Sequence, residues 1–433
     1  MKLESKKGNL IFSGCDTVDL AQKYGTPLYV ISEDKIHERC REIKTSFLDK
    51  YTNTQAVYAS KALLTMAVCK IMEREGLGLD VVSGGELYTA LKADFPADKI
   101  IFHGNNKSYE ELELAIDNGV GRIVVDNLHE LSMLEEILAR KKKRLKILFR
   151  LSPGIEGETH EYIITGQRDS KFGISLDYDR IQDLVKRVIN SEFLDLLGFH
   201  FHLGSQLFQN NIYVQAINLL MELAHKLNKE LGFEMTELNT GGGFGIWYVD
   251  GDERKPLKYF VDPIMETIEK LCKTYALPRP TVVIEPGRWI VGEAGITLYT
   301  VGSIKEIANI RTYASVDGGL PDNPRPALYD AEYHGVIANK IDQKPNMTVT
   351  IAGKCCETGD ILIWDLKTPQ IETGDILAVL STGAYNYSMS SNYNRLPRPA
   401  MVLLKDGREE IIVRRESYED LLVKEVIPKR LRE

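Results

Sequence analysis

Apolar and polar positions alternate in one repeated unit from about Gln55 to Arg288. Short runs of apolar, β-branched residues predict strands. The polar segments between them carry apolar residues at steps of three and four, which predicts amphipathic helices. The eight runs are QAVYAS, LGLDVVS, KIIFHG, RIVVD, LKILFRL, LLGFHFHLGS, MTELNTGGG and TVVIEPGR. Strands that alternate with helices pair in parallel, so the pattern predicts a (β/α)8 TIM-type barrel, with a doubly wound open sheet as the alternative.

The pattern changes after Arg288. Short apolar segments separated by Gly, Pro and Asp turns predict strands, and helical periodicity returns only near the end, in YEDLLVKEV. This part is expected to form a second, all-β domain of the sandwich or barrel kind. The N-terminal runs NLIFSG and PLYVIS are expected to be strands that join it. The predicted boundaries are residues 33–288 for the barrel, and residues 1–32 with 289–433 for the β domain.

Charge and composition narrow the class of function. The 62 acidic residues exceed the 54 basic ones, and the net charge of −8 argues against a nucleic-acid binder or a protein of anionic membranes. The N-terminus is charged and no apolar run reaches the ~18 residues of a spanning helix, so neither a secretory signal nor a membrane anchor is expected. Six cysteines without a CxxC, and eight scattered histidines, predict no metal site and no disulfide scaffold. The expectation is a soluble cytoplasmic enzyme.

Polar and glycine residues gather where the predicted barrel strands end. The active site of this fold lies at the carboxyl ends of the strands. The residues at these ends are Lys61, Asp80, His103, His200, His202, Ser205, the glycines at 241–243, Glu285, Gly287 and Arg288. A ligand site at this rim is therefore predicted.

The glycine run at 241–243 is typical of a loop that holds an anion. Glycines let backbone N–H groups approach a phosphate closely, and phosphate sites in these barrels commonly follow strands seven and eight. The run lacks the Lys-Ser/Thr pair of a P-loop and the spacing of GxGxxG. A tight turn without a ligand is the alternative interpretation.

Three side chains at the same rim fit pyridoxal 5'-phosphate (PLP). Lys61 stands where a lysine can form a Schiff base, although a solvated surface lysine is the alternative. Glu285 suits a pyridinium nitrogen, or it simply pairs with Arg288. His202 suits stacking on a flat ring, or it is an ordinary core histidine. Their joint placement with the glycine loop predicts a PLP site.

Several ordered motifs give this sequence a resemblance to a known family. They are Tyr58-Ala59-Ser60-Lys61-Ala62, Phe201-His202-Leu203-Gly204-Ser205-Gln206, Gly241-Gly242-Gly243-Phe244-Gly245, Glu285-Pro286-Gly287-Arg288, Cys356-Glu357-Thr358-Gly359-Asp360 and Gly383-Ala384-Tyr385. Together they resemble the alanine-racemase-fold (fold-type III) PLP-dependent decarboxylases, and within them the diaminopimelate decarboxylases. The ending Arg414–Leu421 and the stretch from Thr159-His160 to Lys171-Phe172-Gly173 resemble the same subfamily.

The resemblance implies a role for each matching residue. Lys61 would hold PLP as a Schiff base. Cys356, in preference to Cys355, would reprotonate the carbanion after CO2 leaves. The cofactor would also be bound by Asp80, His202, Ser205, Gly242, Gly243, Glu285, Gly287, Arg288 and Tyr385. The substrate would be held by Arg288, Arg325, Tyr329, Glu357 and Tyr385, with the arginine forks on its remaining carboxylate and Glu357 on its distal ammonium.

The resemblance also implies a reaction and an assembly. The substrate would be meso-2,6-diaminopimelate, a small amino acid, converted to L-lysine and CO2 in the last step of lysine biosynthesis. The Cys-Glu segment would reach the active site of a partner subunit, which implies a homodimer with shared sites. Leu63 and Trp289 depart from the usual pattern and bear on substrate breadth. The alternatives are a same-fold decarboxylase of ornithine, arginine, lysine or carboxynorspermidine, an amino-acid racemase, and a PLP-carrying or structural protein without catalysis.

Overall fold

The chain is described by a computed structural model that covers residues 3–155 and 170–432. It divides into two compact units. The barrel unit comprises residues 37–246 and 253–290. The β unit comprises residues 1–36, 247–252 and 291–433. Each unit is described by itself.

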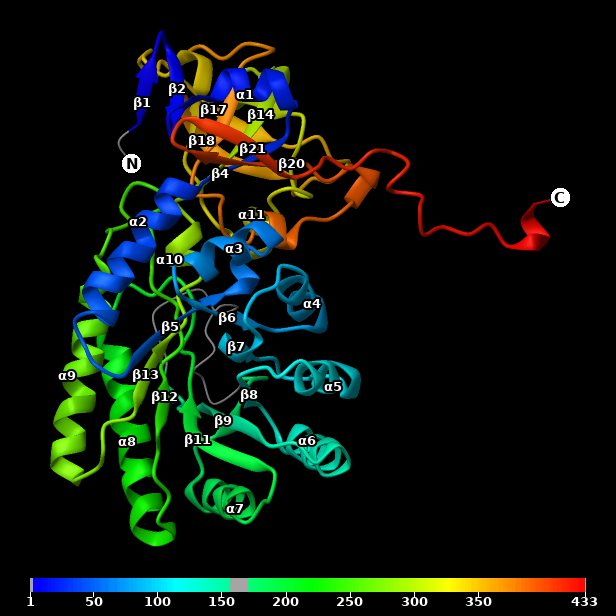
Figure 1. The fold of residues 1–433 in the computed structure, drawn as a ribbon. Coiled ribbons are helices and arrows are strands. Elements are labelled where there is room, and N and C mark those ends of the chain that lie inside the picture. The colour runs from blue at the N-terminus through cyan, green and yellow to red at the C-terminus, as the bar shows by residue number, and fades with distance from the viewer. Residues whose placement is uncertain (1–2, 156–169, 433) are drawn as a thin grey trace. The chain divides into compact units, whose positions relative to one another are not determined.

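A closed ring of eight parallel strands forms the centre of the barrel unit (Figure 1). The ring runs in the order β9-β11-β12-β13-β5-β6-β7-β8, and β8 pairs with β9. This closure confirms the predicted TIM-type barrel and shows that the open-sheet alternative is wrong. The strands are β5 (Thr54–Ala59), β6 (Gly78–Val81), β7 (Ile100–Phe102), β8 (Arg122–Val125), β9 (Leu145–Ser152), β11 (Leu194–His200), β12 (Glu237–Asn239) and β13 (Thr281–Ile284). A short strand, β10 (Ile174–Ser175), pairs with β9 outside the ring.

Helices follow the strands in sequence and lie outside the ring (Figure 1). They are α2 (Glu33–Ile43), which begins in the β unit, α3 (Met66–Arg74), α4 (Gly84–Lys92), α5 (Tyr109–Asp117), α6 (Leu128–Lys141), α7 (Tyr178–Ile189), α8 (Asn211–Leu231), α9 (Leu257–Tyr275) and α10 (Arg288–Val291), whose last residue lies in the β unit. Ser83, Ser108, Asn127 and Asp177 precede α4 to α7, and each side chain accepts the N–H three residues on. These caps satisfy donors that a helix leaves unpaired, and so they fix where each helix begins.

The barrel interior is filled by inward-facing apolar side chains, so the ring is a packed core. Val57, Ile101, Val124, Leu148 and Val283, from β5, β7, β8, β9 and β13, form one buried cluster. Because all eight strands run the same way, residues that follow their carboxyl ends meet at one rim. A turn of 3-10 helix, η2 (Ser60–Ala62), follows β5 at this rim. The unit also has the π-helical turn η1 (Lys44–Leu48) and the 3-10 turn η3 (Ala97–Lys99).

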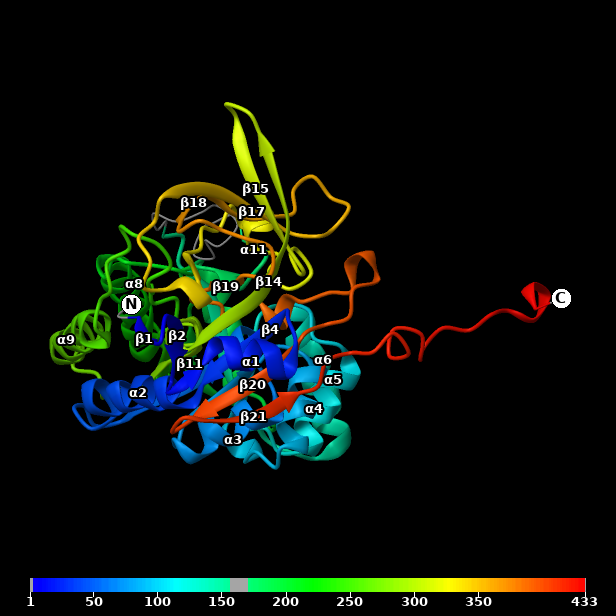
Figure 2. The same ribbon diagram turned by 90° about the horizontal axis from the view of Figure 1, so that it is seen from above.

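The β unit is built on a nine-stranded sheet. Its path is β18-β17-β15-β14-β4-β20-β21, and β19 pairs with both β14 and β16. The long antiparallel pair of β14 and β15 projects clearly in Figure 2. The strands are β4 (Leu28–Ser32), β14 (Gly295–Ile307), β15 (Arg311–Val316), β16 (Gly335–Ile337), β17 (Met347–Ala352), β18 (Ile361–Thr368), β19 (Ile376–Val379), β20 (Ala400–Lys405) and β21 (Arg408–Val413).

The N-terminal strands join this unit in two different ways. PLYVIS supplies β4, which pairs with β14 and β20 as predicted. NLIFSG supplies β2 (Asn9–Phe12), which belongs to a separate three-stranded sheet with β1 (Glu4–Lys6) and β3 (Cys15–Asp16). Leu10 and Phe12 of β2 are buried in the same apolar cluster as β4 residues, so β2 joins the core rather than the large sheet.

The β unit is the second, β-rich domain that the sequence predicts, and one expectation within it is wrong. Besides its strands the unit contains α1 (Thr17–Tyr24), α11 (Arg325–Tyr329) and the 3-10 turns η5 (Ala338–Lys340), η6 (Tyr387–Met389), η7 (Tyr393–Arg395) and η8 (Lys429–Leu431). YEDLLVKEV forms turns instead of a helix. Four of its apolar side chains, Tyr418, Leu422, Val423 and Val426, are exposed, and a short helix without a buried apolar face is not stable in water. In the described part of the chain, no helix is long and apolar enough to cross a bilayer.

Candidate active site

Lys61 lies in η2, directly after the first barrel strand, and it is exposed. Two contacts shape this turn: the Tyr58 hydroxyl donates to the Leu63 carbonyl at 2.7 Å, and the Ala59 N–H donates to the Pro286 carbonyl at 3.4 Å. The strand before Lys61, β5, pairs with β6 on one side and with β13 on the other. Asp80 lies on β6 and Glu285 directly follows β13, so Lys61 follows the strand between them. Its positive charge opposes the effect of burial on the pKa of Asp80.

Glu285 is buried immediately after β13 and is held by three side chains from other strands. Asn239 Nδ2 donates to its Oε1 at 2.7 Å. The Nε2 atoms of His103 and His200 lie 2.8 and 3.3 Å from its two carboxylate oxygens. Burial alone would raise the pKa of Glu285, but the facing imidazoles outweigh it and hold the pKa well below the usual value. Glu285 is therefore a fixed carboxylate, ionised at neutral pH.

The His103 and His200 rings meet edge to face with centroids 4.8 Å apart. Burial lowers the pKa of His200 to about 3, so its imidazole is neutral at physiological pH. Ligand atoms of His103, His200 and Glu285 lie within 4.8 Å of one another, which is also the arrangement of a potential metal site. At 2.8 and 3.3 Å, the two imidazoles contact the Glu285 carboxylate directly, and these contacts orient it. The absence of a metal stays a prediction.

Asp80 is a buried carboxylate one residue before the end of β6, the second barrel strand. Its Oδ1 lies 4.0 Å from His103 Nε2 and has no hydrogen-bond partner among the described residues. Burial is the main cause that raises the pKa of Asp80, and the His103 charge opposes it. A buried polar atom left without a partner is costly, and such atoms concentrate where a ligand supplies the missing partner.

The glycine loop follows β12 and is packed too tightly for any side chain. Gly241 and Gly243 have φ values of +67° and +98°, which favour glycine. A Cβ on Gly242 would lie 2.1 Å from the Glu285 carbonyl oxygen, and one on Gly243 would lie 2.2 Å from the Gly204 carbonyl oxygen. Gly287 is similarly close to the side chain of Ala59. This packing alone accounts for the glycines, so their phosphate-binding role stays a proposal.

His202 contacts this loop, and two more of the predicted residues, Arg288 and Ser205, contact each other. His202 Nδ1 accepts the Gly242 N–H at 3.3 Å, which places any remaining proton of a neutral ring on Nε2. Burial, and then the nearby Lys61 charge, lower the pKa of His202 well below its usual value. Arg288 donates from an NH2 group to Ser205 Oγ at 2.8 Å, so the guanidinium and the hydroxyl assigned to the phosphate lie in direct contact.

No role was predicted for three residues at this site: His103, His200 and Asn239. Each lies at or just after the carboxyl end of a barrel strand. A polar side chain at the end of an apolar strand can be recognised in the sequence, and this feature identifies the two histidines. It does not predict what either histidine does. No role was predicted for the buried Arg150 on β9 either. Its charge acts to lower the pKa values of Asp80, His200 and His202.

The predicted substrate residues of the β unit form a second cluster. Arg325 is buried at the start of α11, and its guanidinium lies over the rings of Tyr329 and Tyr385, at 5.2 and 5.3 Å from their centroids. Its Nε has no hydrogen-bond partner among the described residues. Tyr385 has a φ of +64°, a strained conformation for a tyrosine and one that is concentrated at functional sites.

Cys356 and Glu357 lie in a surface loop between β17 and β18, and both are exposed. The Cys356 N–H donates to Asn394 Oδ1 at 2.7 Å, which fixes the backbone of the loop. Burial and the neighbouring Asp360 raise the pKa of Cys355 to about 12, so Cys355 differs sharply from its exposed neighbour.

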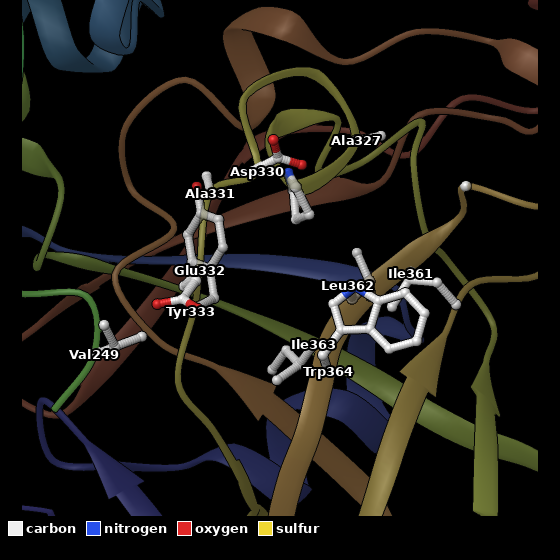
Figure 3. A pocket seen from close by; sticks show the side chains of 12 residues that line it. Val249, Ala327, Asp330, Ala331, Glu332, Tyr333, Ile361, Leu362, Ile363 and Trp364 are labelled. Carbon is white, nitrogen blue, oxygen red and sulfur yellow. The ribbon is translucent and has the colours of Figure 1, made fainter. Parts of the chain in front are cut away.

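Other predicted positions lie as follows. Leu63 and Trp289 are both buried, and the Arg39 guanidinium lies 4.5 Å from the Trp289 ring centroid. Thr159 and His160 lie outside the described residues. A cavity of about 550 Å³ in the β unit is lined by Val249, Glu332, Tyr333, Trp364 and neighbours (Figure 3). None of the described residues that line it is a predicted site residue.

The barrel rim has the groups that PLP requires. Its fixed carboxylate suits a pyridinium nitrogen, the unpartnered Asp80 oxygen suits a further polar group, and Lys61 suits the aldehyde carbon. The fold and this rim define a barrel enzyme of the PLP-dependent class.

Comparison with known proteins agrees. Residues 33–292 match the family "Pyridoxal-dependent decarboxylase, pyridoxal binding domain". The diaminopimelate decarboxylase of Bacillus methanolicus is 50% identical over 412 residues, covering 95% of each chain, and that of Bacillus subtilis is 47% identical, covering 97% of this chain and 95% of its own. The crystal structure of the M. jannaschii diaminopimelate decarboxylase with L-lysine superposes with a TM-score of 0.92 at 34% identity, covering 99% and 98% of the chains.

The chain therefore belongs to the pyridoxal-dependent decarboxylases, and within them to the diaminopimelate decarboxylase family. Its cofactor is PLP, as predicted from the rim residues and the resemblance. Family membership also excludes a PLP-carrying or structural protein without catalysis, because the members of this family are decarboxylases.

Proposed function

We propose that this chain removes CO2 from the D-centre of meso-2,6-diaminopimelate and produces L-lysine, the last step of lysine biosynthesis. The similarity to diaminopimelate decarboxylases over almost the whole chain supports this function. The enzyme works as a homodimer with shared active sites. All six cysteines are unpaired, which fits the reducing cytoplasm as its compartment.

The observation that carries the substrate assignment is the buried guanidinium of Arg325. Within the described chain its Nε lacks a hydrogen-bond partner, and its near neighbours are the aromatic rings of Tyr329 and Tyr385. A buried cation in this state suits an anionic ligand, and the guanidinium fork suits a carboxylate. Diaminopimelate keeps one carboxylate after decarboxylation, whereas ornithine, arginine and lysine keep none. Arg325 therefore favours the diacid over the mono-carboxylate alternatives, with Arg288 as a second contact.

Residues of the barrel rim would hold the cofactor. Bound PLP supplies an electron sink for the pair of electrons left when the bond to the carboxylate breaks. Glu285, kept ionised by its imidazole neighbours, would hold a proton on the pyridine nitrogen. His202 would lie on the ring face, and Asp80 would accept a hydrogen bond from the cofactor. Gly242, Gly243, Gly287, Arg288 and Ser205 would bind the phosphate, and Tyr385 would contact both cofactor and substrate.

Two groups would handle bonds and protons during the reaction. The Lys61 amine would bind the cofactor covalently between turnovers and give way to the substrate amine. Cys356, from the partner subunit, would deliver a proton to the carbon that has lost CO2. Its exposure leaves its thiol open to a partner, while the pKa of about 12 makes Cys355 a poor acid. Glu357 would bind the distal ammonium of the substrate.

The test is CO2 release from the PLP-loaded protein with meso-diaminopimelate, L-ornithine, L-arginine and L-lysine as separate substrates. We expect kcat/KM for diaminopimelate to exceed the others by at least about 100-fold, the loss typical of a buried charge left unpaired. A preference for a mono-carboxylate would keep the cofactor and Lys61 but overturn the role of Arg325. Epimerised diaminopimelate formed without CO2 would indicate a racemase instead.

A further inference from the structure

The last part of the chain is an extended arm with an exposed apolar surface. We call residues 417–432, which follow β21, the arm. Figures 1 and 2 both show it leaving β20 and β21 and running away from them toward the C-terminus. Tyr418, Val423 and Val426 are 74%, 77% and 79% exposed, and Leu422, Ile427 and Leu431 are also more than half exposed. Large apolar side chains gathered in this way mark a surface that binds another macromolecule.

The start of the arm makes hydrogen bonds within itself and to η7. Ser417 and Asp420 exchange two hydrogen bonds, N–H to Oδ2 at 2.7 Å and N–H to Oγ at 3.2 Å. Arg395 donates to Glu425 Oε1 at 2.5 Å and to the Leu421 carbonyl at 3.4 Å. The arm is therefore tied through Leu421 and Glu425 to η7, the turn that contains Arg395.

The same turn holds the loop of the proposed proton donor. Asn394, the neighbour of Arg395, accepts the Cys356 N–H through Oδ1 at 2.7 Å. Asn394 and Arg395 both have positive φ, 50° and 59°. Two consecutive non-glycine residues persist in this conformation only when their surroundings hold them there. One residue of the turn thus contacts the Cys356 loop and the next contacts the arm.

We propose that the arm docks on a second copy of this chain, and that this docking fixes, through Arg395 and Asn394, the loop that presents Cys356 to that copy's active site. The inference rests on the proposed function, in which Cys356 acts on a partner's substrate. The second copy is the occupant because the arm is structurally continuous with exposed Cys356 and Glu357, the residues that the proposed function directs to the partner. Dimer assembly and delivery of the proton are then coupled.

A photo-crosslinking experiment tests the docking. A benzophenone amino acid replaces Val423 in the full-length, PLP-loaded protein, and exposed Lys229 near the end of α8 is the control position. Irradiation is expected to convert at least tenfold more of the Val423 variant than of the control into a covalent dimer. Crosslinks confined to single chains would overturn the docking, because the arm would then fold back on its own subunit.

A mixing experiment tests the coupling. Lys61→Ala and Cys356→Ala variants, each inactive, are combined so that hybrid dimers regain one working site. In parallel samples the arm is removed from one partner only, in a chain that ends at Glu416. Removal from the Lys61→Ala copy, which supplies Cys356, is expected to lower the regained activity at least tenfold. Removal from the Cys356→Ala copy is expected to change it less than twofold.

Two further outcomes are decisive. Equal losses from either removal, with sedimentation showing hybrid dimers in both samples, would overturn the coupling. Arg395→Ala in the Cys356-supplying copy breaks the tie while leaving the arm intact, and it should reproduce the loss. If the full-length hybrid regains no activity, the proposal that two subunits share an active site is wrong. The Val423 crosslink still shows, independently of activity, whether the arm docks on a second copy.

Discussion

Asn239 Nδ2 donates a 2.7 Å hydrogen bond to Oε1 of Glu285, and the same Asn239 accepts the Gly241 N–H through Oδ1 at 3.0 Å. One side chain therefore joins the carboxylate assigned to the pyridine nitrogen to the first residue of the glycine loop. The two ends of the proposed cofactor site share a support at the end of β12. Changes at Asn239 should consequently affect both the charge of Glu285 and the loop.

Replacement of Asn239 by Asp tests how the charge of Glu285 is set. The substitution removes a donor and places a like charge beside the carboxylate, so the pKa of Glu285 should rise. In the wild-type protein this pKa is depressed, so Glu285 remains ionised until pH falls well below its ordinary value. The acid limb of the kcat/KM profile for diaminopimelate should move to higher pH in Asn239→Asp. An unchanged acid limb would show that Asn239 does not control the carboxylate.

Asp80 gives a stability prediction with a definite sign. Its pKa is raised in the folded protein, chiefly by burial, so its contribution to stability is largest below the unfolded-state pKa and is lost as pH rises through the folded-state value. Asp80→Asn should therefore stabilise the PLP-free protein near pH 7 by about 1–3 kcal/mol, the usual cost of an unsatisfied buried group. Thermal unfolding measured between pH 4 and 8 should show this gain growing with pH. A gain that shrinks with pH would contradict the assignment.

Gly243 offers a test of the glycine loop with a matched control. Gly243→Ala would place a Cβ 2.2 Å from the Gly204 carbonyl oxygen, whereas Gly119 has a positive φ of 70° with nothing within 4 Å of its Cβ position. Both substitutions carry the backbone strain, of about 1 kcal/mol, but only Gly243→Ala forces the loop to move. We expect PLP affinity, measured by absorbance titration, to fall at least tenfold for Gly243→Ala and to stay within twofold for Gly119→Ala. Equal effects would remove the loop from the cofactor site.

Arg325 provides the test of substrate choice. Arg325→Lys keeps the charge but loses the planar fork, and we expect it to raise KM for diaminopimelate at least tenfold. Arg325→Ala should lower kcat/KM by at least about 100-fold, in line with an unpaired substrate carboxylate. Arg187→Ala, which breaks an exposed ion pair with Glu135 on neighbouring helices, is the control and should leave both constants unchanged. Near-normal turnover by Arg325→Ala would rule out the carboxylate contact.

The barrel could be predicted because its signal is local and repeated. Each strand is a run of β-branched residues in the sequence, and each helix is an amphipathic segment. Parallel pairing brings the strand ends to one rim. The strand pattern alone is enough to place Lys61, Asp80 and Glu285 at the same rim. It gives no role to His103, His200 or Asn239, because a strand end shows only that a side chain reaches the rim and not which side chain it meets across the barrel.

The details of the β unit that the sequence pattern leaves open, or predicts wrongly, have a common physical cause. Periodicity in YEDLLVKEV marks an apolar face, but it does not tell whether anything covers that face, and a short helix without a covering partner is unstable. The alternation in β2 predicts a strand, yet it does not specify which sheet that strand joins. The link from Cys356 through Asn394 and Arg395 to the arm depends on two residues with positive φ. The sequence does not predict this conformation, because most arginines, and most asparagines too, adopt negative φ.

The most direct test of the central claim is the fate of each carboxylate of the substrate. Meso-diaminopimelate labelled with carbon-13 at either the D-centre or the L-centre carboxylate is supplied to the PLP-loaded protein and to its Lys61→Ala variant. We expect labelled CO2 from the D-centre carboxylate only, one L-lysine per CO2, and no release by Lys61→Ala. Release from the L-centre carboxylate, or undiminished release by Lys61→Ala, would contradict the proposed function.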